Sequence, residues 1–142
     1  MKIVIGADHA GFELKKFIIE HFNKLFTFED VGTYSEESVD YPDFAHPLAE
    51  YISKGTYEKA ILMCGSGNGV AITANKHPNV RAALCWNEEI AKLARLHNNA
   101  NVLVLPARFI TKDHAIKIID VFFNTDFEGG RHQNRIDKIN LH

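Results

Sequence analysis

Residues 62–72 read Leu-Met-Cys-Gly-Ser-Gly-Asn-Gly-Val-Ala-Ile, an apolar run that ends at Cys64 and continues into three alternating glycines. The run at 59–63 predicts a buried strand and 69–76 predicts a short helix, so the glycines fall in the connection between them. Glycines in such a connection let backbone N–H groups approach an anion closely, but they also serve tight turns. The stretch therefore predicts a strand–loop–helix unit. Its glycine loop could either bind an anion or simply form a tight turn.

The same alternation of short apolar runs and helical periods continues in both directions along the chain. Because the predicted strands are almost purely apolar, we expect both faces of their sheet to be covered. The order of elements predicts a three-layer, Rossmann-like α/β fold, in which a five-stranded parallel sheet carries helices on both faces. The remaining strands are predicted at 3–5, 26–31, 82–85 and 102–105, and the remaining helices at 11–25, 40–53, 88–96, 112–123 and 131–139.

Length and composition predict a single domain over residues 1–142 and exclude several classes of function. The chain has 142 residues, of which 46% are hydrophobic, and no linker divides it. Its net charge of −2 supplies no overall basic field for nucleic acid or an acidic membrane. No apolar span reaches the roughly 20 residues that cross a bilayer. The two cysteines form no CxxC motif or zinc-type cluster, so we expect a reduced, cytoplasmic protein without a membrane or nucleic-acid partner.

Polar and reactive residues follow four of the predicted strands. In open parallel sheets, ligands bind at the carboxyl ends of the strands, so these residues are the candidates for a site. Histidines away from these ends (His46, His77, His114 and His142) are expected at the surface. The residues that follow the strands are Asp8 and His9, then Cys64, Gly65 and Ser66, then Trp86 and Asn87, and finally Arg108.

Cys64 is the candidate base or nucleophile. A lone cysteine at a strand end is more often a small buried hydrophobe. Here the loop amides and the following helix N-terminus would lower the pKa of Cys64, which favours the thiolate. Cys85 has no glycine loop beside it and is expected to pack in the core.

His97, Arg131 and Arg135 each have a structural and a functional interpretation. His97 near a helix end could simply meet the helix dipole, or it could be an acid–base group in a connecting loop at the edge of the site. Arg131 and Arg135, four apart, would share one helix face. Their guanidinium groups suit a phosphate, although a solvated basic face is the more common meaning of such a pair.

Taken in order, several segments resemble type B ribose-5-phosphate isomerase, from the sugar-phosphate isomerase family that includes the galactose-6-phosphate isomerase subunits. The resemblance runs from about residue 2 to 139. No single motif is specific, whereas the ordered set is. The segments are Gly6-Ala7-Asp8-His9-Ala10-Gly11, Asp40-Tyr41-Pro42, Cys64 to Gly69, Ala74-Asn75-Lys76, His97-Asn98 and Gly129-Gly130-Arg131-His132-Gln133.

The resemblance implies an isomerase that interconverts ribose 5-phosphate and ribulose 5-phosphate without a metal or an organic cofactor. It implies that Cys64 transfers the proton and that His97 opens the sugar ring. Because Ser66 stands in the same loop as Cys64, its hydroxyl could pass a proton between the two oxygens of the substrate. The resemblance also implies a site built across a homodimer or tetramer, with the last helix (about 129–140) packed on a partner subunit. The substrate-binding residues that it implies are Asp8, His9, Gly65, Ser66, Gly67, Asn68, Gly69, Asn98, Arg108, Arg131 and Arg135.

One branch of this family has serine at the position of Cys64 and a glutamate base just past the glycine loop. This chain has Val70 there, which leaves Cys64 as the base that the resemblance implies. Two other functions stay open. One is the same chemistry on a hexose 6-phosphate such as allose or galactose 6-phosphate, and the other is a non-catalytic sugar-phosphate-binding module.

Overall fold

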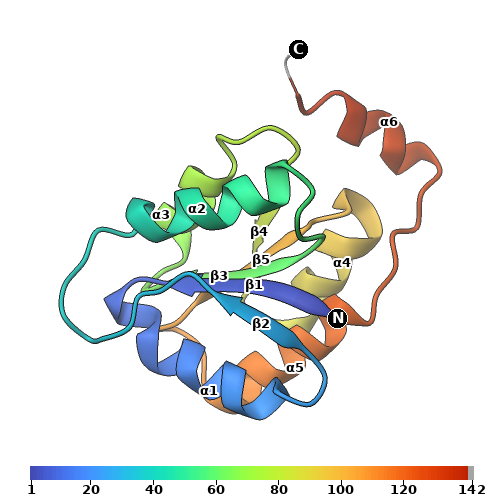
Figure 1. Cartoon of the computed structure of the whole chain (residues 1–142). Coiled ribbons are helices and arrows are strands. Elements are labelled where there is room, and N and C mark those ends of the chain that lie inside the picture. Colours follow the sequence, from blue (N-terminus) through green and yellow to red (C-terminus); the bar gives the residue numbers. More distant parts are fainter. Residues whose placement is uncertain (141–142) are drawn as a thin grey trace.

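The computed structural model describes residues 1–140 and contains one five-stranded, all-parallel sheet (Figure 1). The strand order is β2-β1-β3-β5-β4, so β3 is central and β2 and β4 lie at the edges. The predicted fold class is confirmed. The strands are β1 (Lys2–Ala7), β2 (Thr27–Asp30), β3 (Ala60–Cys64), β4 (Ala82–Leu84) and β5 (Val102–Pro106).

Helices cover both faces of the sheet, as predicted, and give the three layers visible in Figure 1. One core cluster joins α1, α4 and α5 to alternate residues of β1, β3 and β5. A second cluster joins α2 and α3 to the residues that point to the opposite face. The helices are α1 (Phe12–Phe22), α2 (Pro42–Ser53), α3 (Asn68–Ala74), α4 (Glu88–Asn98), α5 (Lys112–Phe123) and α6 (Arg131–Asp137).

The expectation that all strands are nearly purely apolar is wrong for β2. Its sequence, Thr27 to Asp30, alternates between exposed and half-buried positions. An edge strand pairs on one side only, so its residues need not be buried on both faces. The three inner strands are almost wholly buried, apart from Lys2 at the start of β1.

The strand order fixes where a ligand site can form. The chain passes from β1 outward to β2 and then crosses back to β3 on the other side of β1, so the order reverses between β1 and β3. At such a reversal the adjoining loops diverge and leave a crevice beyond the carboxyl ends of the two strands. Asp8 and Cys64 stand at these two ends.

The last helix, α6, leaves the body of the domain (Figure 1). It is shorter than the expected 129–140 and contacts α4. In the figure it lies on the side where the chain enters β1, which is the side of the amino ends of the strands. His142 falls outside the described residues. His46, His77 and His114 are partly or fully exposed, as expected.

Among residues 1–140, no helix combines the length and the apolar character needed to cross a membrane.

Candidate active site

A cleft of about 410 Å³ opens at the carboxyl ends of β1, β3 and β5. Because these three strands are neighbours in the sheet, segments distant in sequence meet at one place. Seven predicted site residues line the cleft, together with Ala10, Tyr41 and Phe109. The seven are Asp8, His9, Cys64, Gly65, Ser66, Gly69 and Arg108.

Cys64 is the last residue of β3 and lines the cleft although only 5% of it is exposed. Its backbone is held rigidly, since its carbonyl oxygen accepts a hydrogen bond from Ala107 N at 2.9 Å. One residue later, Gly65 O accepts from Arg108 N at 3.0 Å. The thiol therefore stands on a fixed strand end, shielded from bulk water but open to the cleft.

The glycine loop after Cys64 offers unpaired backbone donors. Gly67 adopts a φ of +80° and lies against Leu84, a conformation and a contact that a side chain would prevent. In the part of the chain that the structure describes, the N–H groups of Gly65, Ser66 and Gly67 donate to no protein atom. Asn68 N donates to Ser66 Oγ at 3.2 Å. Free amides beside a thiol can stabilise negative charge on a bound oxygen.

Arg108 brings a positive charge to the same loop. A Cβ placed on Gly65 would lie 3.1 Å from Arg108 Nη1, so the guanidinium group passes directly over that glycine. Arg108 is exposed and lines the cleft, where its fork can bind an anion.

Asp8 and His9 complete the β1 side of the cleft. Asp8 is buried, and its Oδ1 accepts hydrogen bonds from the N–H groups of Ala10 at 3.0 Å and Gly11 at 3.2 Å, so it caps the short 3₁₀ turn His9–Gly11 that follows β1. His9 Nδ1 accepts from Val39 N at 3.2 Å. In the neutral ring this bond places the proton on Nε2, which is then the donor available to a ligand.

Two aromatic residues of the cleft were not among the predicted site residues. Tyr41, the N-cap residue of α2, packs against the loop so closely that a Cβ on Gly69 would lie 2.5 Å from its ring. Phe109 is 76% exposed at the rim. Only its position directly after the predicted Arg108 could have indicated Phe109. Tyr41 stands in Asp40-Tyr41-Pro42, one of the segments that carry the resemblance, and that was the only signal for it.

The structure does not bring the other predicted residues to this cleft. Of the two positions considered for His97, the helix end is confirmed and the connecting loop is wrong: the residue lies in the last turn of α4. This helix starts beyond the carboxyl end of β4 and runs back to the amino end of β5. His97 is therefore separated from Cys64 by at least the roughly 13 Å length of a five-residue strand.

The amino ends of the strands, where His97 lies, also carry Asn98, Arg131 and Arg135. Asn98 is next to His97 on α4, and the two arginines lie on α6, which contacts α4. Both arginines are exposed. The two remaining predicted residues, Gly67 and Asn68, do not line the cleft either: Gly67 lies against Leu84, and Asn68, the first residue of α3, lines a neighbouring hollow.

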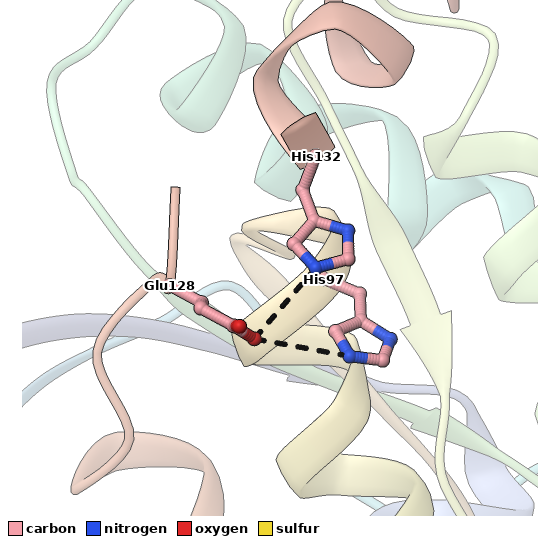
Figure 2. Close-up of side chains that lie close together, drawn as sticks. All are labelled: His97, Glu128 and His132. Carbon is pink, nitrogen blue, oxygen red and sulfur yellow. Dashed lines mark ion pairs between the residues drawn. The ribbon is translucent and has the colours of Figure 1, made fainter. Parts of the chain in front are cut away.

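His97 belongs to a three-residue cluster with Glu128 and His132 (Figure 2). The two imidazole rings stack, with centroids 4.3 Å apart, and the Nε2 atoms of His97 and His132 lie 4.0 Å and 3.6 Å from Glu128 Oε2. Burial is the main cause that lowers the pKa of His132; the neighbouring His97, Arg131 and Arg135 also lower it, and the carboxylate of Glu128 opposes them. Neither Glu128 nor His132 was predicted as a site residue, and because Gly129 and Gly130 between them adopt positive φ angles, no helical spacing could have indicated their contact.

A larger hollow of about 1000 Å³ lies beside the edge strand β4, between residues 75–83, Asn98, Ala100 and residues 139–140. Among the described residues that line it there is no cysteine and no carboxylate. Its chemistry does not suggest catalysis by itself.

Comparison with known proteins agrees with these features. A family model described as Ribose/Galactose Isomerase matches residues 3–139. Ribose-5-phosphate isomerase B of Escherichia coli is 40% identical over 97% of this chain and 93% of its own length. The crystal structure of a ribose 5-phosphate isomerase from Thermotoga maritima superposes with a TM-score of 0.96 at 49% identity, and covers 99% of this chain and 98% of its own.

A second solved structure carries a ligand. The ribose-5-phosphate isomerase B of Mycoplasma genitalium, determined with bound ribulose-5-phosphate, has a TM-score of 0.92 and 50% identity to this chain. The match covers 97% of this chain and 93% of the other.

Proposed function

This chain belongs to the ribose/galactose isomerase family, and we propose that it is an aldose–ketose isomerase that interconverts D-ribose 5-phosphate and D-ribulose 5-phosphate. The observation that carries the proposal is the cleft itself. Cys64 lies at a strand end beside three unpaired loop amides and Arg108. This set can remove a proton from carbon and hold the charge that results.

Each part of the loop has a role in the proposed proton transfer. The Cys64 thiolate removes the proton from carbon 2 of the open-chain aldose and returns it to carbon 1. The intermediate enediolate carries negative charge on oxygen, and the loop amides from Gly65 to Gly69 hold that charge as it develops. Each such preorganised donor contributes a few kcal/mol in other enzymes. Ser66, in the same loop, passes a proton between the two oxygens, and Asp8 holds the sugar.

Ring opening requires a second acid–base pair, because ribose 5-phosphate is mostly cyclic in solution. We assign this step to His97, with Asn98 as a neighbouring contact to the sugar. An imidazole changes its protonation state near neutral pH, which suits general acid–base catalysis of ring opening.

The separation of Cys64 from His97 supports a site shared between two copies of this chain. Within one chain Cys64 lies at the carboxyl ends of the strands and His97 at their amino ends, and no hinge motion of a packed helix would join them. We propose a homodimer, or a tetramer built from such dimers, in which α4 and α6 of one subunit complete the cleft of the other. The hollow beside β4 and the exposed position of α6 are consistent with a subunit interface there.

We assign phosphate binding to Arg108, Arg131 and Arg135, with His9 nearby. Binding energy from the phosphate holds the reacting carbons in position although it lies several bonds away from them.

Neutralising both helix arginines, as Arg131→Gln with Arg135→Gln, is expected to raise the KM for ribose 5-phosphate by about 100-fold, because two charge-assisted contacts of about 1.5 kcal/mol or more each are lost. Steady-state kinetics on the variant would measure this change. Lys138→Gln is the matched control, since it removes a positive charge just beyond the same helix and should leave KM nearly unchanged. An unaltered KM in the double variant would remove both arginines from the phosphate site.

The proposed activity is tested by following ketose formation from ribose 5-phosphate by absorbance. Allose 6-phosphate and galactose 6-phosphate would be assayed in parallel, and we expect kcat/KM to be highest for the pentose. Faster turnover of a hexose would replace the substrate assignment and keep the reaction class. Tight binding of ribose 5-phosphate without turnover would favour a binding module and contradict the proposal.

We also propose that the enzyme works in the cytoplasm, in the non-oxidative part of pentose phosphate metabolism. Both cysteines are free thiols, and a catalytic thiol is preserved in a reducing compartment.

A further inference from the structure

The cluster of His97, Glu128 and His132 has the composition of a metal site. Each residue offers one ligand atom, and these atoms all lie within 4.8 Å of one another. They come from the last turn of α4, from the segment before α6, and from α6 itself, as Figure 2 shows. Two imidazoles and one carboxylate form a typical ligand set for Zn²⁺, which leaves a fourth position for water or another ligand.

The geometry is close to what such an ion requires. In a tetrahedral site with bonds of about 2 Å, neighbouring ligand atoms are about 3.3 Å apart. The distances from Glu128 Oε2 to the two Nε2 atoms, 3.6 Å and 4.0 Å, are within about 1 Å of that value. Both nitrogens lie near the same carboxylate oxygen, but the two rings are stacked at an interplanar angle of 18°, so one ring must turn before both Nε2 lone pairs point at a single ion.

The cluster combines one fixed ligand with two adjustable ligands. The side chain of His132 is 6% exposed and packed, whereas those of His97 and Glu128 are 41% and 56% exposed. An ion could therefore draw the two exposed side chains toward the buried imidazole, with a tilt of the stacked rings.

The charges around His132 limit how tightly a cation can bind. The guanidinium groups of Arg131 and Arg135 on the same helix repel a dication, and the carboxylate of Glu128 offsets this repulsion in part. We therefore expect reversible binding that is weaker than at a closed structural zinc site.

We propose that His97, Glu128 and His132 bind Zn²⁺ and that the bound ion inhibits the enzyme. Binding as such does not depend on the proposed function, whereas inhibition rests on the assignment of ring opening to His97. The metal bond would occupy the lone pair of His97 Nε2. That nitrogen could then neither accept nor donate the proton needed to open the sugar ring.

Binding is tested on the full-length oligomer without any activity measurement. Titration with Zn²⁺ by calorimetry should give one site per chain, and Co²⁺ should produce the strong visible absorption of a tetrahedral site. Glu128→Gln should weaken Zn²⁺ binding at least about tenfold, in line with the loss of a ligand or its close support. Glu88→Gln is the matched control, because Glu88 pairs with His114 at the other end of α4.

Two other groups could bind the added metal ion, and the experiment must distinguish them from the proposed site. Cys64 would give a thiolate charge-transfer band with Co²⁺, so a spectrum that disappears in Cys64→Ala would contradict the proposal. His46 Nδ1 and His77 Nε2 lie 2.7 Å apart on the surface and could chelate an ion as a pair. His46→Ala should leave the one-per-chain site intact, and loss of the site in this variant would equally contradict the proposal.

Inhibition is then measured with ribose 5-phosphate as substrate. Saturating Zn²⁺ should lower turnover about 100-fold, which is the scale of losing one general acid–base group, and a chelator should restore it. In Glu128→Gln, inhibition should require at least about tenfold more Zn²⁺. Equal sensitivity of the wild-type chain and Glu128→Gln would overturn the inhibitory site, whereas absent isomerase activity with intact metal binding would count against the proposed function alone.

Discussion

Cys64→Ala is expected to abolish isomerisation, with kcat for ribose 5-phosphate falling by about 10³- to 10⁴-fold or more, because the reaction loses the base that removes the proton from carbon. No second base is expected to replace it, since Val70 stands where one branch of the family has a glutamate. The substitution removes a single sulfur atom from a buried strand end. We therefore expect the variant to keep its fold, its oligomeric state and its affinity for the sugar phosphate.

Cys85 provides the internal control for this result. It is fully buried, and burial raises the pKa of its thiol to about 12, so it should not react with a thiol-alkylating reagent at neutral pH. Cys85→Ala should retain activity, and alkylation of the wild-type chain at Cys64 alone should inactivate it. Near-normal turnover in Cys64→Ala would remove Cys64 as the base.

His97→Ala is expected to separate the two directions of the reaction. Ribose 5-phosphate must be opened before it can react, whereas ribulose 5-phosphate cannot close to a five-membered ring because its terminal oxygen carries the phosphate. Turnover of ribose 5-phosphate should therefore fall about 100-fold, while the initial rate from ribulose 5-phosphate should fall far less. Initial rates in both directions, at saturating substrate, measure the difference.

His114→Ala is the matched control for this variant. His114 also lies beside α4 and pairs with a glutamate, at 3.8 Å from Glu88, but it is distant from the proposed ring-opening group. Its replacement should leave both directions unchanged. Equal losses in the two directions for His97→Ala would argue against a role in ring opening.

The fold follows from sequence patterns that reflect burial. Apolar runs such as those of β3 and β5 occur where a strand is covered on both faces, which is the reason that they predict a parallel sheet. β2 departs from this rule because it is an edge strand. The strand order itself depends on which helices cover which face, and no local pattern in the sequence encodes it.

The part of the candidate site at the carboxyl ends of the strands could be predicted from sequence patterns, whereas the position of His97 could not. Asp8, Cys64 and Arg108 follow parallel strands, and the ends of neighbouring parallel strands necessarily meet at one edge of the sheet. His97 precedes a strand, so it lies at the amino ends of the strands, away from Cys64. Only the resemblance to the isomerase family linked the two residues. The contact of His97 with Glu128 and His132 spans more than 30 residues and has no short-range spacing that could predict it.

The central claim is that each catalytic site combines Cys64 of one subunit with His97 of another, and mixing two inactive variants tests it most directly. Cys64→Ala and His97→Ala would be unfolded together, refolded and assayed with ribose 5-phosphate. In a randomly mixed twofold dimer, half of the molecules contain both variants, and each of these has one intact site, so activity should return to about a quarter of the wild-type value. If the mixture stays as inactive as its two components, the two residues do not act in a shared site and the account is contradicted.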